Sequence, residues 1–139
     1  MTSPAPITFS LETTLTELDR LSGELERMGE VWDLAPAVIL QLNLALDELF
    51  TNVVDYGIEP GDRSQVDFTI QLRNNQLEII ICDEGKPFDP TISVDPDLTI
   101  PPMDKKIGGL GIFLVRQYTD SIDYRRDNGK NIITLTKTI

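Results

Sequence analysis

The spacing of apolar residues divides this sequence into strand-like and helix-like segments, and their order limits the folds open to it. Residues 7–13 alternate apolar and polar side chains with a period of two, which predicts a strand. Apolar residues recur every three or four positions over 15–28 and again over 36–56, which predicts two amphipathic helices. Pro36 is favoured in a first helical turn, and Gly57 is typical of a helix end.

Strand-like segments in the rest of the chain come in adjacent pairs. Residues 66–72 and 77–82 form one pair, and residues 121–126 and 131–138 form a second pair. A short buried helix is predicted over 112–118, before the second pair. Strands that arrive in pairs with helices between the pairs predict an α+β two-layer sandwich. Its sheet is expected to be mixed but mostly antiparallel, with about five strands and with the helices on one face.

Length and composition narrow the functions open to the chain. Its 139 residues, 40% of them hydrophobic, suffice for one core, so a single domain over 1–139 is expected. The sequence has no histidine and one cysteine, Cys82, which excludes Ser-His machinery and an internal disulfide. A net charge of −11 repels phosphate backbones, so no nucleic acid is expected as a partner. An anionic ligand such as ATP would need Mg²⁺ and local backbone donors.

The sequence gives no sign of export or of a membrane segment. The first six residues contain no basic region that leads into an apolar core. No apolar run approaches the roughly 20 residues that a membrane span needs. We therefore expect a soluble, cytoplasmic protein that does not enter a membrane.

The second predicted helix carries the first group of residues with chemical potential. Glu48 and Asn52 are four positions apart, so both side chains project from one face, beside the apolar stripe. An ordinary polar pair on a helix flank would give the same pattern. As a functional pair, the amide oxygen of Asn52 can ligate Mg²⁺, and the Glu48 carboxylate can accept a proton from a nucleophile.

A second group follows the predicted strand at 77–82. Asp83 stands at the end of this apolar strand, where a carboxylate costs free energy unless it meets a hydrogen-bond donor. The exocyclic amine of adenine would be such a donor, and Gly85 would let the backbone approach the flat ring closely. A simple turn remains the alternative, because Asp-x-Gly is common in turns.

Three glycines make up the third group, at the start of the helix predicted over 112–118. The sequence KKIGGLGIF begins at Lys105, and free amide groups at a helix N-terminus make a cradle for phosphate oxygens. Lys105 and Lys106 can add positive charge. A flexible joint that closes a lid would use the same glycines, and the Gly-Lys-Ser/Thr of a Walker loop is missing. The irregular segment at about 84–106 is too long for a simple connector.

Together, the order Glu-x-x-x-Asn, Asp-x-Gly and then Gly-x-Gly resembles a superfamily of ATPases. This superfamily includes gyrase, the mismatch-repair and heat-shock ATPases and the histidine kinases, and its ATP site is called the Bergerat fold. Within it, ALDELFTN at 45–52 and GLGIFLVRQ at 109–117 look most like the anti-sigma regulatory serine/threonine kinases. The resemblance covers nearly the whole chain and implies an ATP lid at about 89–108.

The resemblance also implies roles for single residues. Asn52 would ligate Mg²⁺, and Glu48 would be the general base toward the acceptor hydroxyl. Asp83 would bind the adenine amine. The other positions implied to contact ATP are Gly85, Gly109, Gly111, Thr51, Thr134 and Lys106. Asp47 and Tyr56 stand where family members often carry asparagine and histidine.

An activity and a set of partners follow from the same resemblance. It implies an ATP- and Mg²⁺-dependent protein serine/threonine kinase that acts as an anti-sigma factor in partner switching. The implied partners are a sigma factor and a small STAS-type antagonist protein, which the kinase phosphorylates, and a homodimer is expected. The first alternative is a non-catalytic module that holds ATP to shape a partner-binding surface. The second alternative is a detached ATP-binding domain of a histidine kinase. The absence of histidine and the absence of a dimerising helical hairpin both disfavour it.

Overall fold

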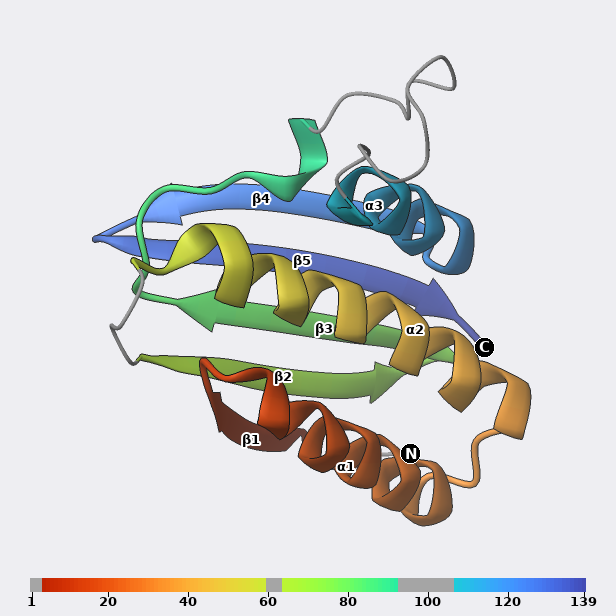
Figure 1. The fold of residues 1–139 in the computed structure, drawn as a ribbon. Helices are drawn as coiled ribbons and strands as arrows, with labels where there is room; N and C mark the ends of the chain where they lie inside the picture. The colour runs from red at the N-terminus through yellow and green to blue at the C-terminus, as the bar shows by residue number, and fades with distance from the viewer. Residues whose placement is uncertain (1–3, 60–63, 93–106) are drawn as a thin grey trace.

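The fold is built from one sheet and a layer of helices. The computed structural model describes residues 4–59, 64–92 and 107–139. In the described residues, five strands lie in the order β1-β2-β3-β5-β4, and three α-helices cross one face of the sheet (Figure 1). The elements are β1 Ile7–Glu12, α1 Leu18–Val31, α2 Pro36–Asn52, β2 Gln65–Arg73, β3 Gln76–Asp83, α3 Ile107–Tyr118, β4 Ser121–Asp127 and β5 Lys130–Thr138.

The strand pairing confirms the α+β architecture and corrects one detail of it. Five strands with helices on one face agree with the expectation from sequence. All strand pairs among the described residues are antiparallel, so the expectation of a mixed sheet was wrong. The reason is that β4 and β5 return as a hairpin, and β5 then pairs with β3 in the antiparallel sense.

Among the residues that the structure describes, three short helical segments extend or join these elements. A 3₁₀ turn, Leu15–Glu17, precedes α1, and a second one, Pro90–Ile92, follows β3. A π-helical turn, Val53–Gly57, continues α2. The helix α3 begins at Ile107 rather than at 112, so the glycines expected in a loop lie in its first turns.

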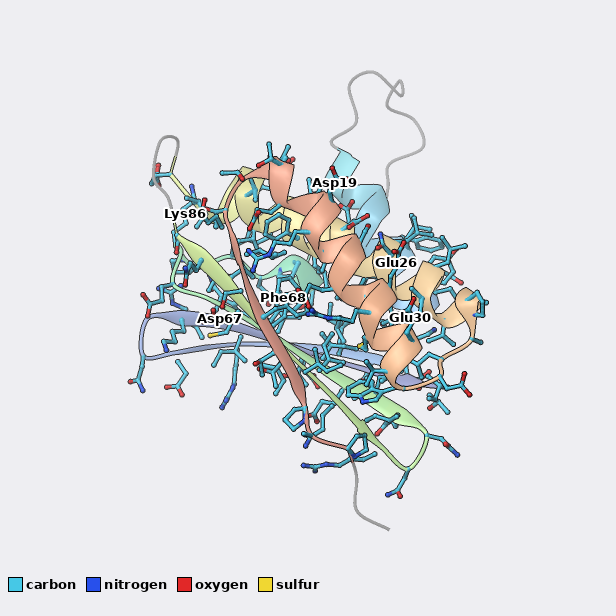
Figure 2. The ribbon with its side chains drawn as sticks, turned by 90° about the horizontal axis from the view of Figure 1, so that it is seen from below. Asp19, Glu26, Glu30, Asp67, Phe68 and Lys86 are labelled. Atoms are coloured by element: carbon cyan, nitrogen blue, oxygen red, sulfur yellow. The ribbon has the colours of Figure 1, made fainter. Side chains whose placement is uncertain are left out.

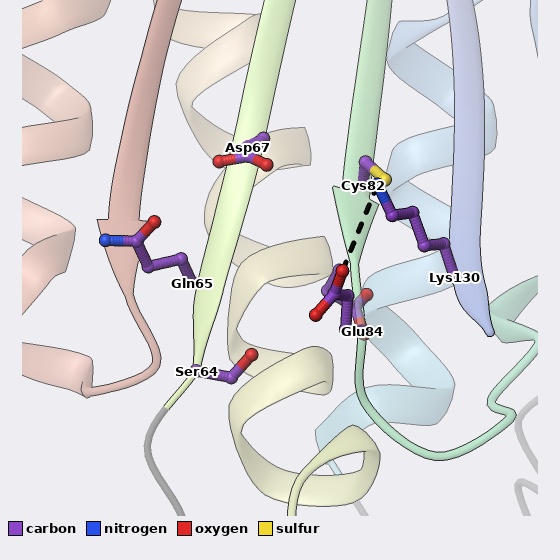
Figure 3. A pocket seen from close by; sticks show the side chains of 7 residues that line it. Ser64, Gln65, Asp67, Cys82, Glu84 and Lys130 are labelled. Atoms are coloured by element: carbon purple, nitrogen blue, oxygen red, sulfur yellow. Dashed lines mark ion pairs between the residues drawn. The ribbon is translucent and has the colours of Figure 1, made fainter. Parts of the chain in front are cut away.

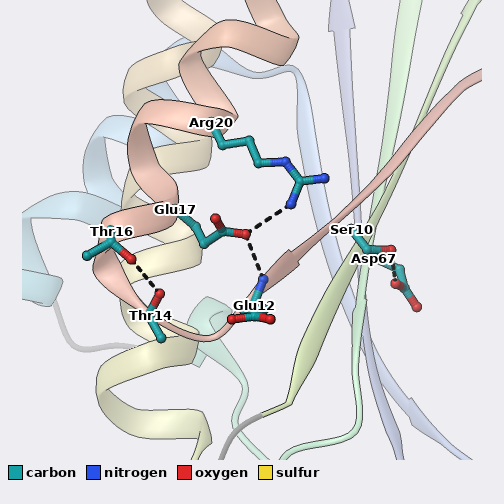
Figure 4. Close-up of polar contacts among 7 residues, drawn as sticks. All are labelled: Ser10, Glu12, Thr14, Thr16, Glu17, Arg20 and Asp67. Carbon is teal, nitrogen blue, oxygen red and sulfur yellow. Dashed lines mark hydrogen bonds and ion pairs between the residues drawn. The ribbon is translucent and has the colours of Figure 1, made fainter.

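Polar side chains fix the connection between β1 and α1. Glu17 Oε2 accepts a hydrogen bond of 3.0 Å from the backbone N–H of Glu12 and one of 3.2 Å from Arg20 (Figure 4). On β1 itself, Ser10 Oγ donates to Asp67 Oδ1 of β2 over 2.6 Å. The two contacts of Glu17 hold the turn before α1 at the end of β1, and α1 lies over the β1–β2 edge of the sheet (Figure 1).

The hydrophobic core lies between the helices and the sheet. Phe68 of β2 faces the helices, and its ring centroid lies 6.5 Å from that of Phe50 on α2 (Figure 2). Asp19, Glu26 and Glu30 are exposed on the outer side of α1 (Figure 2), and the exposed residues of this helix also include Arg20 and Arg27. The central helix contributes the largest share of fully buried helix residues: Leu42, Ala45, Leu46, Leu49 and Phe50.

This central position explains part of the apolar character of α2, although Leu40 and Leu44 are 61% and 42% exposed. By length and composition alone, the stretch Pro36–Gly57 is apolar enough to cross a membrane. In the structure it packs on the sheet and contacts both α1 and α3. A helix with neighbours on three sides needs apolar residues around most of its circumference.

Two leucines on α2 test this placement. Leu46 is fully buried, whereas Leu44 is 42% exposed on the same helix. We expect Leu46→Ala to lower the free energy of unfolding by about 3 kcal/mol, because it leaves a cavity in the core. We expect Leu44→Ala to lower it by less than about 1 kcal/mol. Urea titration measures both, and equal losses would contradict the orientation of α2.

Candidate functional site

One side of α2 is tied to α1. Ser22 Oγ donates to Asn43 Oδ1 over 2.8 Å, and Asn43 Nδ2 donates to Asp47 Oδ2 over 2.9 Å. Burial raises the pKa of the Asp47 carboxyl, and the bond from Asn43 opposes this shift. Asp47 therefore belongs to the contact between the two helices, although it directly precedes Glu48 in sequence.

The opposite side of α2 faces α3. Lys137 Nζ donates to Gln41 Oε1 and to the carbonyl of Tyr118, each over 2.7 Å, which places Gln41 beside the last residue of α3. Residues 41, 45, 48 and 52 share one face at helical spacing. Glu48 and Asn52 therefore project toward α3, as the sequence predicts for a pair on one face.

The two helices run antiparallel, which brings the start of α3 toward the site. Because Gln41 is near the beginning of α2 and Tyr118 is at the end of α3, the first turns of α3 point toward the Asn52 end of α2 (Figure 1). Gly109 and Gly111 lie in these turns. Backbone N–H groups in a first helical turn have no intrahelical partner and can bind an anion.

Glu48 sits in an environment that disfavours its charge. Burial raises the pKa of the Glu48 carboxyl; a hydrogen bond with Asn52 lowers it, and the negative charge of Asp55 raises it further. Within the described residues, Glu48 Oε1 is buried without a hydrogen-bond partner. Asn52 is only 4% exposed. A proton or a nearby cation would therefore stabilise this carboxylate.

Asp83 is buried at the end of β3, on the sheet face covered by the helices. It is 3% exposed, and its Oδ1 accepts hydrogen bonds from the backbone N–H of Gly85 and from Asn131 Nδ2, at 2.9 and 3.0 Å. Both bonds hold the same oxygen. The carboxylate is therefore fixed in orientation, and Oδ2 is the oxygen that can meet a ligand.

The loop after β3 packs against the turn that follows α2. The carbonyl of Gly57 accepts a hydrogen bond of 2.9 Å from the backbone N–H of Lys86. A Cβ at Gly85 would lie 2.3 Å from the same carbonyl oxygen, so no other residue fits there. The rings of Tyr56 and Phe88 stack with centroids 5.8 Å apart. The strand end that carries Asp83 and the helix end that carries Asn52 are thus joined.

Comparison with known proteins agrees with this arrangement. A family model described as a histidine kinase-like ATPase domain matches residues 11–137. The chain belongs to the histidine kinase-like ATPase domain family.

Curated relatives of this ATPase domain are similar over much of its length. Serine-protein kinase RsbW of Halalkalibacterium halodurans is 33% identical over 141 residues, covering 99% of this chain and 80% of the relative. Serine/threonine-protein kinase BtrW of Bordetella bronchiseptica is 32% identical over 95 residues, covering 68% of this chain and 67% of the relative. Serine-protein kinase RsbW of Bacillus subtilis is 27% identical over 118 residues, covering 81% of this chain and 70% of the relative.

A solved structure shares the fold of the ATPase domain. It contains the RsbU and RsbW domains of Rv1364c from Mycobacterium tuberculosis, and it aligns with a TM-score of 0.68 at 14% identity. The alignment covers 97% of this chain and 32% of that longer chain. The chain therefore spans about a third of that protein, and the likeness concerns the fold alone.

The residues of the ATPase domain fit a Mg²⁺ ion that is shared with a ligand. Asn52 offers an amide oxygen as a ligand, and the neighbouring Glu48, whose buried Oε1 has no partner in the described residues, adds negative charge that favours a cation nearby. Such oxygens are the donors that Mg²⁺ prefers. No group of three or more His, Cys, Asp or Glu side chains suited to a metal occurs among the described residues. Phosphate oxygens of a nucleotide would have to complete the coordination.

The structure contradicts a role for Thr134 beside Asp83. Thr134 pairs with Ile80 on β3 and Asp123 on β4, on the face of the sheet that the helices leave uncovered. Its neighbours Ile133 and Leu135 are buried on the other face. Because side chains alternate along a strand, Thr134 points away from the site.

Asn131 is the residue of β5 that sequence reasoning missed. It is the cross-strand partner of Asp83, is 2% exposed, and lies on the helix-covered face. The sequence indicated its orientation, because Asn131 is two and four positions before the apolar residues Ile133 and Leu135 and so shares their face of the strand. A polar residue among the buried residues of a strand indicates that the helix-covered face of the sheet borders a polar site at that position.

The remaining predicted residues have mixed outcomes. Thr51 is half-buried on α2, three positions after Glu48, and its contact with a nucleotide stays a prediction. Lys106 lies outside the described residues, as does most of the predicted lid at 89–108. Gly85 is brought beside Asp83, where its own packing against Gly57 already requires a glycine.

A polar hollow of about 290 Å³ lies on the uncovered face of the sheet (Figure 3). Its single lysine, Lys130, lies 3.9 Å from Glu84, so this cation already has an acidic partner. Burial raises the pKa of the Cys82 thiol, which keeps it protonated and unreactive at neutral pH. Its acidic lining would repel a triphosphate. The lining residues are Ser64, Gln65, Asp67, Cys82, Glu84 and Lys130, together with Asp83 at the end of β3, whose buried carboxylate is bonded to Asn131 on the helix-covered face.

The tight packing of Gly85 leads to a stability prediction. We expect Gly85→Ala to lower the free energy of unfolding by about 1–3 kcal/mol, because its methyl group overlaps the Gly57 carbonyl. The control is Gly23→Ala on α1, where an added Cβ meets nothing within 4 Å. That change should stabilise the protein by up to about 1 kcal/mol. Thermal unfolding distinguishes the two, and a neutral Gly85→Ala would show that the loop does not pack as described.

The raised pKa of Glu48 predicts a pH-dependent stability effect. A carboxyl whose folded-state pKa exceeds its unfolded value loses stability as pH rises through the folded pKa. Without nucleotide, Glu48→Gln should therefore stabilise the protein at about pH 8 by roughly 0.5 kcal/mol, a figure kept small for a half-exposed group. The gain should disappear at about pH 4. A gain that is independent of pH in thermal unfolding would argue against ionisation as its cause.

Proposed function

We propose that this chain is an ATP- and Mg²⁺-dependent protein serine/threonine kinase that acts as an anti-sigma factor in partner switching. One observation carries the proposal. Glu48 and Asn52 on α2 and Asp83 at the end of β3 lie on the helix-covered side of the sheet, and the adjoining loop and turn connect them. Family membership and relatives named as serine-protein kinases support the same conclusion.

In this proposal, ATP lies with its adenine at Asp83 and its phosphates at the start of α3. The exocyclic amine of adenine donates to Asp83 Oδ2, because Oδ1 is held by the protein. The phosphates accept hydrogen bonds from the free N–H groups in the first turn of α3, which holds Gly109, and Gly111 just after this turn leaves room for them because it has no side chain. Asn52 ligates Mg²⁺, and Lys106 and the predicted lid at 89–108 cover the phosphates.

Glu48 supplies the chemistry of the transfer. Its carboxylate takes the proton from the hydroxyl of the acceptor serine or threonine as that oxygen bonds to the γ-phosphorus and the bond to ADP breaks. Burial raises the pKa of Glu48, which makes its carboxylate a better proton acceptor than an exposed glutamate. Bound Mg²⁺ would neutralise negative charge on the phosphates.

The proposed partners are proteins. The substrate is a small STAS-type antagonist, and the sequestered partner is a sigma factor. A net charge of −11 and the acidic residues exposed on the outer side of α1 suit protein partners with basic surfaces rather than nucleic acid. A homodimer in the cytoplasm completes the proposal.

Substitutions on α2 test the proposed activity. We expect Glu48→Gln to slow transfer from radiolabelled ATP to a cognate antagonist by about 10²- to 10⁴-fold, with ATP affinity changed only a few-fold. Asn52→Ala should abolish the dependence of ATP affinity on Mg²⁺, as measured by calorimetry.

Asp47→Asn is the matched control, because Asp47 is a neighbouring buried carboxylate that faces α1. It should keep transfer within about threefold of the wild type. Undiminished transfer by Glu48→Gln would refute the assignment of the base. Tight ATP binding by the wild type with no transfer to any antagonist would favour a non-catalytic ATP-binding module.

A further inference from the structure

Asn131 connects the base-recognition residue to the loop that follows β3. Its Nδ2 donates two hydrogen bonds, to Asp83 Oδ1 over 3.0 Å and to the backbone carbonyl of Lys86 over 2.9 Å. Asn131 is 2% exposed and Asp83 is 3% exposed, so the bond between them is shielded from water, whereas the bond to Lys86 is partly buried. Removing one partner would leave a buried polar group unsatisfied, which is costly.

The oxygen of Asn131 gathers donors from two other segments. Oδ1 accepts from Tyr124 Oη over 2.5 Å, from Arg126 over 3.1 Å and from the backbone N–H of Phe88 over 3.4 Å. The same Arg126 nitrogen donates to the carbonyl of Gly85 over 2.7 Å. The network thus holds both Asp83 and the loop from Gly85 to Phe88.

The hydrogen-bonding capacity of Asn131 is fully used within the protein. An asparagine side chain has two N–H donors and one carbonyl oxygen. Both donors and the oxygen of Asn131 already have protein partners. It therefore acts on a nucleotide through Asp83 and the loop, and not by direct contact.

We propose that Asn131 is the positioning residue that gives the site its preference for adenine. By holding Oδ1 of Asp83, it presents Oδ2 to the exocyclic amine of the base. The loop from Gly85 to Phe88, which Asn131 holds, also contacts the turn that follows α2. Lys86 donates a hydrogen bond to the Gly57 carbonyl, and Phe88 stacks on Tyr56. This inference rests on the proposed function, because it requires that the site bind a nucleotide.

The experiment compares ATP with inosine triphosphate, in which a carbonyl oxygen replaces the exocyclic amine. Calorimetry with Mg²⁺ gives both affinities for the wild type, for Asn131→Leu and for Asn131→Asp, which keeps the size, removes the donors and adds a carboxylate beside Asp83. The wild type should prefer ATP. In both variants we expect this preference to fall about tenfold, as for the loss of one hydrogen bond to a charged group, while inosine triphosphate affinity changes less than about threefold.

The control variant is Thr134→Val, which lies on the same strand but faces the other side of the sheet. It should leave both affinities unchanged. A purely structural role for Asn131 would weaken both nucleotides equally, and that result would overturn the inference. An unchanged ratio in Asn131→Asp, in a variant that melts near the wild-type temperature, would also overturn it.

Bracing of the loop has its own readout. Hydrogen exchange in the peptide covering residues 84–92 should slow when ATP binds to the wild type. It should slow much less in Asn131→Leu, and equal slowing would contradict the coupling. Failure of the proposed function is distinguishable, since the wild type would then bind neither nucleotide.

Discussion

The packing of α2 across the middle of the sheet is the interaction on which the rest of this structure depends. Its buried residues, such as Leu46 and Phe50, form a dry contact with the strands, and this contact fixes the rotation of the helix. Once the rotation is fixed, helical spacing decides where each polar residue goes. Asp47 turns toward α1, whereas Glu48 and Asn52 turn toward α3. The helix thus provides the core and one wall of the site at the same time.

Polar groups at the edge of this core differ in whether the protein supplies them with hydrogen-bond partners. Asp83 Oδ1 has two donors, and the side chain of Asn131 is saturated. Glu48 Oε1 and Asp47 Oδ1, by contrast, are buried without a hydrogen-bond partner among the described residues. Buried polar groups are normally paired, so these two carboxylate oxygens are the ones left for a proton or a ligand, and of the two only Glu48 projects toward α3.

Sequence patterns predicted those features that depend on local spacing. The shared face of Glu48 and Asn52 follows from helical periodicity, and the place of Asp83 follows from the end of an apolar strand. The prediction for Thr134 was wrong because it considered the hydroxyl alone. Side chains alternate between the two faces of a strand, and this alternation puts Thr134 on the uncovered face. Asn131 was missed because its partners come from β3, the following loop and β4, and only the folded sheet assembles them.

The most direct test of the central claim is a crystal structure of the protein with Mg²⁺ and a non-hydrolysable ATP analogue. The account predicts one nucleotide on the helix-covered side, with its exocyclic amine bonded to Asp83 and its Mg²⁺ bound to Asn52. A nucleotide bound instead in the polar hollow beside Asp67, or coordinates that place Asn52 and Asp83 around different ligands, would contradict it.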